Sequence, residues 1–342
     1  MKTESDCAVA WWLFACCAMV FATLIVGGVT RLTHSGLSIV EWQPLLGAIP
    51  PLGEAHWQAL FAKYQQSPQF QKINVDMTLD GFKFIFWWEW LHRLLGRIIG
   101  VVFVVPFLWL LHKGRIDRNL APKLFGFFVL GGLQGAMGWY MVKSGLVDDP
   151  RVSQYRLAAH LGLAFLIFGL MLWTSLGLLG NRVAAASGTS LRTLQTVGGV
   201  LVAMFFVMVL SGALVAGTHA GALYNSFPLM GEHFVPPEIL SLSPAWRNVF
   251  ENQSTIQFDH RTIAWLLFFS LPPFCWIVIS RSPLARPAAF ALLAMLLVQL
   301  SLGIATLLNG VPIVLAAAHQ AGAMILFALL IWLNHLLRSA AR

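Results

Sequence analysis

Long apolar stretches dominate the sequence and alternate with shorter polar ones. A helix needs about 20 residues to cross the hydrocarbon core of a bilayer, and eight stretches are long enough. They run from Val9 to Val29, Phe84 to Leu111, Leu124 to Val142, Arg156 to Gly180, Leu194 to Ala216, Ile256 to Ile279, Pro287 to Leu308 and Pro312 to Leu337. The pattern predicts an all-α integral membrane protein with eight transmembrane helices.

Composition supports this class, because 58% of the residues are hydrophobic and only 11% are charged. With the N-terminus inside, the formal net charge of +8 falls on the inner segments and the outer segments are neutral. The positive-inside rule therefore predicts cytoplasmic termini. We expect a multi-pass protein of a bacterial inner membrane, anchored by an uncleaved first helix. Because the basic residues flank the spans, we expect membrane lipid as a partner and no nucleic acid.

Two parts of the chain repeat one another. The segment GGVTRLTHSGLSIVEWQPLLG, from Gly27 to Gly47, aligns with GALVAGTHAGALYNSFPLMG, from Gly212 to Gly231, so that His34 meets His219. Further matches are His92-Arg93 with His260-Arg261, Gln134-xxx-Gly138 with Gln299-xxx-Gly303, and LAAHLGLA (Leu157 to Ala164) with AAAHQAGA (Ala316 to Ala323). The order of these matches indicates an internal duplication of four helices.

Because each repeat holds an even number of helices, both repeats enter the membrane from the same side. This predicts two pseudo-symmetric four-helix bundles: an N-terminal half (1–180), a cytoplasmic linker (181–192) and a C-terminal half (193–342). The outer loops from Arg31 to Lys83 and from Gly217 to Gln257 are too long for simple turns. We expect them to be partly helical lids over the bundles.

Four histidines lie near the starts of the second, fourth, sixth and eighth predicted helices, which all run in the same direction. They are His92, His160, His260 and His319. At 1.5 Å per residue they come to a similar depth, one pair in each half. Paired imidazoles in a helical bundle suit the iron of haem. A lone histidine is more often a satisfied polar group in a helix interface, but the duplication of the pair favours ligands. No thiolate joins them, which disfavours zinc.

The remaining histidines and the cysteines are interpreted as structural or solvated. His34 and His219 lie at helix ends where water is close. The histidines expected to be solvated are His56, His112, His233 and His335. No cysteine falls in an outer loop, so Cys7, Cys16, Cys17 and Cys275 are expected to be packing residues.

Glu89 distinguishes the two halves. It lies three residues before His92 and on the same helix face, whereas the corresponding residue in the other half is Gln257, which cannot exchange protons. The alternative role for Glu89 is an ion pair with Arg93. A carboxyl group in one half only indicates that only the N-terminal half carries out chemistry.

Arginines gather near the outer ends of the histidine helices. They are Arg93, Arg97, Arg156 and Arg261. Guanidinium groups bind carboxylates in a bidentate manner, so these residues are candidate partners for haem propionates. They could equally be anchors at the membrane interface.

Longer motifs resemble those of the haem A synthase family and cover nearly the whole chain. They are TRLTHSGLSIVEWQP (Thr30 to Pro44), NVDMTLDGFKFI (Asn74 to Ile85), EWLHRLLGR (Glu89 to Arg97), AGALYNSFPLMG (Ala220 to Gly231), RNVFENQSTIQFDHR (Arg247 to Arg261) and AAHQAGAM (Ala317 to Met324). The resemblance implies an enzyme that oxidises the C8 methyl group of haem O to the formyl group of haem A by successive hydroxylations, for use in cytochrome oxidase.

The resemblance also implies roles for single residues and partners. His260 and His319 would ligate a resident haem b, His92 and His160 would hold the substrate haem O, and Glu89 would act at the substrate. Haem O synthase and a membrane electron acceptor are the implied partners, and a homo-oligomer is left open. Because this chain lacks the outer-loop cysteine pair of some members, it resembles the subgroup without that pair.

Two other classes of function remain as alternatives. A transmembrane di-haem b-type electron carrier would hold two equivalent haems, and the difference between Glu89 and Gln257 argues against equivalence. A transporter or haem-delivery protein would need broken helices. Pro272, Pro273 and Pro287 lie toward the inner helix ends, away from the histidines.

Overall fold

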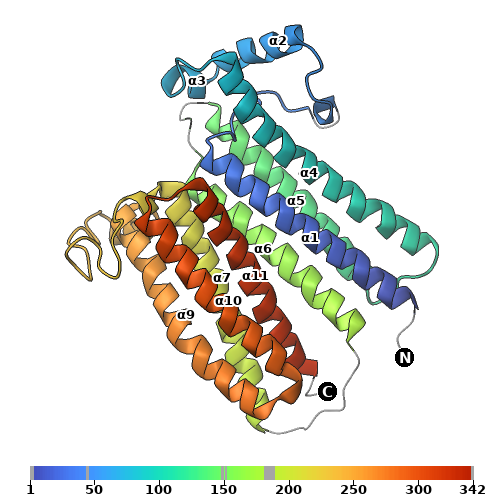
Figure 1. Cartoon of the computed structure of the whole chain (residues 1–342). Coiled ribbons are helices and arrows are strands. Elements are labelled where there is room, and N and C mark those ends of the chain that lie inside the picture. The colour runs from blue at the N-terminus through green and yellow to red at the C-terminus, as the bar shows by residue number, and fades with distance from the viewer. Residues whose placement is uncertain (1–3, 44–45, 148–149, 151, 181–188, 340–342) are drawn as a thin grey trace. The chain divides into compact units, whose positions relative to one another are not determined.

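The computed structural model describes residues 4–43, 46–147, 150, 152–180 and 189–339. The described residues form eight long helices (Figure 1). They are α1 (Glu4–Leu32), α4 (Leu79–His112), α5 (Ala121–Gly145), α6 (Gln154–Leu179), α7 (Thr189–Thr218), α9 (Gln253–Arg281), α10 (Arg286–Leu308) and α11 (Ile313–Ser339). All eight are long and apolar enough to span a membrane. The all-α multi-pass prediction is confirmed.

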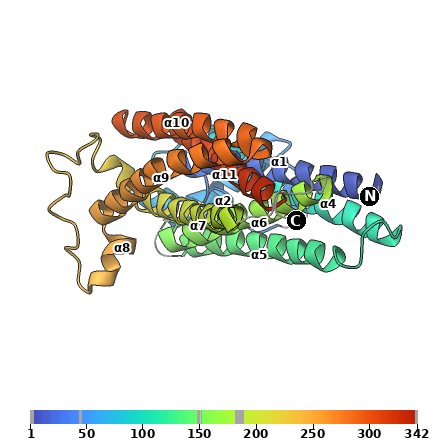
Figure 2. The same cartoon turned by 90° about the horizontal axis from the view of Figure 1, so that it is seen from below.

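The long loops contain short helices, as predicted. Between α1 and α4 lie η1 (Leu46–Ala48), α2 (Glu54–Gln65) and α3 (Pro68–Lys72). Between α7 and α9 lie η2 (Ala220–Ala222), η3 (Ala245–Arg247) and α8 (Asn248–Glu251), and this second loop extends beyond the helix ends (Figure 2). That these loops cover the bundles stays a prediction. Pro44 of the first loop motif lies outside the described residues.

The first loop attaches to α4 through aromatic packing. Trp57 and Tyr64 of α2 are buried against Phe82 and Phe86 of α4. The ring centroids of Trp57 and Phe86 are 5.0 Å apart and meet edge to face, a favoured geometry for aromatic pairs. The Thr78 hydroxyl accepts a hydrogen bond from Gly81 N at the start of α4. This cap and the aromatic cluster fix where the loop ends and the helix begins.

The helix ends that precede the two long loops repeat each other. His34 follows α1 with φ of 55°, and His219 follows α7 with φ of 58°. Ser35 N donates to the Thr30 carbonyl oxygen at 2.8 Å, which closes the end of α1. Both histidines thus occupy the left-handed position at which a helix commonly terminates. This geometry supports the structural interpretation of the repeated His34 and His219.

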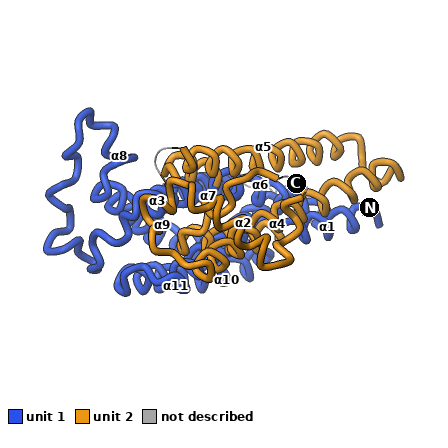
Figure 3. The backbone as a smooth tube through the Cα atoms, turned by 90° about the horizontal axis from the view of Figure 1, so that it is seen from above, with its two compact units in different colours: residues 1–17, 161–342 blue, residues 18–160 orange. Residues whose placement is uncertain are grey.

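The chain forms two compact units (Figure 3). Unit 2 comprises Ala18–His160, and unit 1 comprises Met1–Cys17 with Leu161–Arg342. Within unit 1, α7, α9, α10 and α11 pack together, and α6 joins them where the rings of Phe165 and Phe327 lie 5.5 Å apart. The predicted halves and linker stay a prediction, because residues 181–188 lie outside the described residues.

The cysteines and prolines lie as expected. All four cysteines are free, with Cys16, Cys17 and Cys275 buried and Cys7 half-buried. The helix α9 continues through Pro272 and Pro273 to Arg281. A continuous helix here gives no support to the transporter alternative, which needs broken helices.

Candidate functional site

Each of the four helix histidines packs its imidazole against a glycine of another helix. A Cβ atom added to the glycine would lie close to Cε1 of the ring. The distances are 2.6 Å for Gly27 and His92, 3.2 Å for Gly138 and His160, 3.3 Å for Gly212 and His260, and 2.9 Å for Gly303 and His319. The duplicated glycines of the sequence therefore let the helix backbones approach the rings. The four positions share one local design.

Each compact unit holds one pair. His92 and His160 lie in unit 2, and His260 and His319 lie in unit 1. All four side chains are half-buried. Both histidines of each predicted pair belong to the same compact unit.

In unit 1, both imidazoles are hydrogen-bonded through Nδ1. The Oγ of Ser211 lies 2.8 Å from Nδ1 of His260. The Nε2 of Gln299 lies 3.1 Å from Nδ1 of His319 and donates to the His319 carbonyl oxygen at 3.0 Å. If Nδ1 of His260 carries the ring proton, the Ser211 contact leaves Nε2 of that ring with a lone pair. The Gln299 amide nitrogen can only donate, so Nδ1 of His319 accepts.

In unit 2, Nδ1 of His92 and Nδ1 of His160 are both buried and have no hydrogen-bond partner within the described residues. Gln134 corresponds to Gln299, and its Nε2 donates to the His160 carbonyl oxygen at 3.1 Å. The same nitrogen lies 3.3 Å from Nε2 of His160. The Nδ1 atoms are therefore held in unit 1 but not in unit 2.

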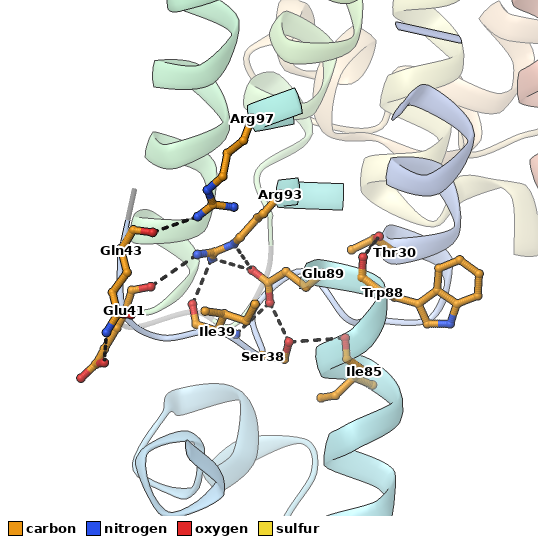
Figure 4. Close-up of polar contacts among 10 residues, drawn as sticks. All are labelled: Thr30, Ser38, Ile39, Glu41, Gln43, Ile85, Trp88, Glu89, Arg93 and Arg97. Carbon is orange, nitrogen blue, oxygen red and sulfur yellow. Dashed lines mark hydrogen bonds and ion pairs between the residues drawn. The ribbon is translucent and has the colours of Figure 1, made fainter. Parts of the chain in front are cut away.

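Glu89 lies in a dense hydrogen-bond network (Figure 4). It is only 2% exposed. Its Oε2 accepts from Ser38 Oγ at 2.7 Å and from Ile39 N at 2.8 Å, and its Oε1 accepts from Nη2 of Arg93 at 2.6 Å. The ion pair with Arg93, which was the structural alternative, is thus present. The network keeps a buried carboxylate fully partnered one helical turn from His92.

The corresponding network in unit 1 lacks the carboxylate but keeps the arginine. In unit 2, Nη2 of Arg93 donates to the Ile39 carbonyl oxygen at 3.0 Å. In unit 1, Nη2 of Arg261 donates to the Tyr224 carbonyl oxygen, also at 3.0 Å, and Nε2 of Gln257 donates to the same oxygen at 3.1 Å. Ile39 and Tyr224 occupy matching positions of the aligned loops. Both units therefore share an arginine that bonds a loop carbonyl oxygen to the histidine helix.

The other two predicted arginines are also engaged by the protein. Arg97 donates from Nη2 to the Gln43 carbonyl oxygen at 2.9 Å. The guanidinium of Arg156 lies 4.5 Å from the ring centroid of Tyr140, which is cation–π geometry. In unit 1, Nε of Arg261 is buried without a hydrogen-bond partner among the described residues. Arg261 therefore has a buried donor that no described residue accepts from.

One histidine prediction is wrong. His56, His112 and His233 are exposed as expected, but His335 is only 8% exposed. Its ring lies 5.0 Å from the ring of Trp173, edge to face, because α6 covers this end of α11. Position near a helix end suggested solvent, and the packing of a second helix removed it.

Sequence reasoning missed the residues that hold the site residues. Ser211, Ser38 and the backbone of Ile39 were not singled out. A signal for Ser211 existed, because the alignment of Gly27 with Gly212 places Val26 opposite Ser211. Where the neighbouring positions of the two repeats match, a hydroxyl in one repeat aligned with an apolar side chain in the other indicates a functional difference between the halves.

The residues present fit haem better than a metal ion held by protein alone. The described residues contain no group of three or more His, Cys, Asp or Glu side chains that could hold a metal ion, whereas structural zinc takes four such ligands. Two half-buried imidazoles in each unit, on apolar helices, fit bis-histidine haem ligation.

The sequence matches a family model described as cytochrome oxidase assembly protein, COX15-CtaA, over residues 10–331. A heme A synthase of Nitrosospira multiformis is 57% identical, across 98% of this chain and 96% of the relative. A heme A synthase of Nitrosomonas eutropha is 54% identical, across 96% and 94%. A heme A synthase of Paracoccus denitrificans is 46% identical, across 96% and 87%. The chain therefore belongs to the COX15-CtaA family of cytochrome oxidase assembly proteins.

Proposed function

We propose that this protein is a haem A synthase, an oxidoreductase that converts haem O to haem A. The C8 methyl group of haem O becomes a formyl group by successive hydroxylations and loss of water, and the product serves cytochrome oxidase. Support comes from the full-length similarity to proteins named heme A synthase. The single structural observation that carries the proposal is the pair of half-buried imidazoles in each compact unit.

The two pairs take different haems in this proposal. His260 and His319 ligate a resident haem b, and His92 and His160 hold the substrate. The contact of His260 with Ser211 and the contacts of His319 with Gln299 support a permanent site, because they hold each ring in place before a ligand binds. The missing Nδ1 partners of His92 and His160 suit a haem that must enter and leave.

Glu89 is the proposed catalytic residue. Ser38, Ile39 N and Arg93 all donate to its carboxyl oxygens and hold the group in place. A carboxylate can accept a proton from the reacting group or stabilise positive charge that develops there. Gln257 can do neither, which supports chemistry in unit 2 only.

Haem supplies the redox chemistry when it is bound, and the protein supplies position and electrostatics. With water as the source of oxygen, oxidising a methyl to a formyl group releases four electrons and four protons, and the proposed partner that takes the electrons is an acceptor in the membrane. Haem O synthase is the proposed source of the substrate. Arg93, Arg97, Arg156 and Arg261 are proposed propionate partners, and the buried Nε of Arg261 makes that residue the strongest candidate.

The proposed location is a bacterial inner membrane with both termini in the cytoplasm. Eight spans, an even number, put the two termini on the same side. The distribution of Lys and Arg selects the cytoplasmic side.

The test is to purify the protein from cells that do and do not supply haem O, and to identify its haems by chromatography and mass spectrometry. We expect haem b in both preparations, and haem O, hydroxylated haem O or haem A only when haem O is supplied. Two equivalents of unmodified haem b in both preparations would instead establish the di-haem electron carrier.

A further inference from the structure

We propose that Ser211 is a positioning residue that fixes the tautomer of His260 and so sets the electronic properties of the resident haem. This inference rests on the proposed function, because it takes His260 as a ligand of haem b. Ser211 is on α7, whereas His260 is on α9, so the contact joins two helices of unit 1.

The direction of the hydrogen bonds follows from the number of protons available. The hydroxyl of Ser211 donates to the Met208 carbonyl oxygen at 2.8 Å. A hydroxyl has one proton, and we infer that it goes to Met208, so that the Ser211 oxygen accepts from Nδ1–H of His260, also at 2.8 Å. Nδ1 therefore carries the proton of the neutral imidazole, and Nε2 keeps the lone pair that a metal requires.

Gly212, the residue after Ser211, contacts the same edge of the His260 ring. A Cβ at Gly212 would lie 3.3 Å from Cε1 of His260 and 3.8 Å from its Nδ1. Ser211 is 8% exposed, so solvent does not compete strongly for its hydroxyl. Two consecutive residues of α7 therefore set both the orientation and the tautomer of the imidazole before any ligand binds.

Unit 2 lacks this arrangement. The residue aligned with Ser211 is Val26, which has no hydrogen-bonding side chain, and Nδ1 of His92 has no partner within the described residues. The hydroxyl of Ser211 thus gives Nδ1 of His260 a partner, whereas Nδ1 of His92 has none among the described residues. We infer that Ser211 marks unit 1 as the permanent site.

A hydrogen bond from Nδ1–H makes Nε2 a stronger electron donor, which stabilises the oxidised iron and lowers its reduction potential. Loss of such a partner costs about 10- to 100-fold in metal affinity in typical sites. Ser211→Ala should therefore raise the midpoint potential of haem b and speed the loss of haem from the protein.

The experiment is a redox titration of haem b in full-length protein, followed by visible and EPR spectra of the oxidised form. We expect a higher midpoint potential and shifted EPR g values in Ser211→Ala, and values near wild type in Ser211→Thr, which keeps the hydroxyl. The matched control is Val26→Ala, which truncates the aligned residue and should leave haem b unchanged. Ser211→Cys, a weaker acceptor, should shift the potential in the same direction as Ser211→Ala and serves if the alanine variant does not fold.

Haem b with wild-type potential and spectra in Ser211→Ala or Ser211→Cys would overturn the inference. Failure of the proposed haem assignment looks different. If His260→Ala kept its full content of haem b, the resident haem would lie elsewhere, whatever the Ser211 variants showed.

Discussion

The histidine pairs of unit 1 and unit 2 share a scaffold and differ in a few polar groups. Both seat their rings on glycines, and both use an arginine to hold a carbonyl group of the preceding loop. Unit 2 has Glu89 and Val26 where unit 1 has Gln257 and Ser211. The duplication thus kept the seating of the rings and the arginine contact. Under the proposed function, the two differences separate a site for chemistry from a site for permanent binding.

The difference extends to the way each loop is anchored. In unit 2, the Ile39 backbone is bonded on both sides, with its N–H to Glu89 and its carbonyl to Arg93. In unit 1, Gln257 and Arg261 both bond one carbonyl, that of Tyr224. The buried carboxylate of Glu89 therefore helps to hold the loop next to the proposed substrate site. In unit 1 the loop is held by the neutral Gln257 and by Arg261.

Removing one histidine from each pair should give the largest difference between the two units. His260→Ala should abolish bound haem b, because an axial ligand is lost and a cavity remains. His92→Ala should retain haem b but lose conversion of haem O. Haem content by pyridine haemochrome spectra and haem A by chromatography measure both effects. Equal loss of haem b in the two variants would contradict the division of roles.

Changing Glu89 tests the chemistry with little change in shape. Glu89→Gln should fold and keep haem b, while conversion falls about 10²- to 10⁴-fold, the usual contribution of a proton-transferring group. Haem A formed per unit of haem b is the measure. The matched control is Gln257→Glu in unit 1, which should leave conversion nearly intact. Unchanged haem A output from Glu89→Gln would remove Glu89 from the mechanism.

Filling the glycine positions tests how tightly each ring is seated. In Gly27→Ala the new Cβ would lie 2.6 Å from Cε1 of His92, whereas in Gly212→Ala it would lie 3.3 Å from Cε1 of His260. Overpacking costs about 1–3 kcal/mol, so Gly27→Ala should lower thermal stability and reduce conversion about tenfold or more. Gly212→Ala should cost less, since a shift of tenths of an ångström relieves it. The melting temperature and haem A yield compare them, and equal losses would contradict the difference in seating.

The smallest expected effect is that acid loosens the loop between α7 and α9 of unit 1. The Tyr224 hydroxyl donates to Oε2 of the exposed Glu238 at 2.5 Å, and this bond lowers the pKa of Glu238 below its usual range. A lowered pKa means that the stabilisation is present at neutral pH and is lost as pH falls through that pKa.

Limited proteolysis of the loop, followed by mass spectrometry, should show faster cleavage of wild-type protein on acidification. Tyr224→Phe should be cleaved at the faster rate already at neutral pH. Identical pH profiles for the two proteins would show that this bond does not order the loop. Lys63 and Glu41 form an exposed ion pair at 2.7 Å in the other loop, and Lys63→Met serves as the control there.

Much of the site was predictable because the duplication repeats it in the sequence. The four histidines, Gln134 and Gln299 with their glycines, and the contrast between Glu89 and Gln257 were all visible as aligned positions. The structure gave two of these a physical role, since the glycines seat the rings and the glutamines bond the histidine carbonyls. His335 was misjudged because its burial depends on α6, which is distant in sequence.

The sequence by itself determined the eight spans, since apolar length is a local property that the bilayer reads directly. It also determined the duplication and the identity of the paired histidines. Only the tertiary structure decided which groups partner Glu89, that Ser211 holds His260, and that Nδ1 is held in one pair and not in the other. Those facts depend on the distance and orientation of side chains from different helices, which helix packing sets and hydropathy does not encode.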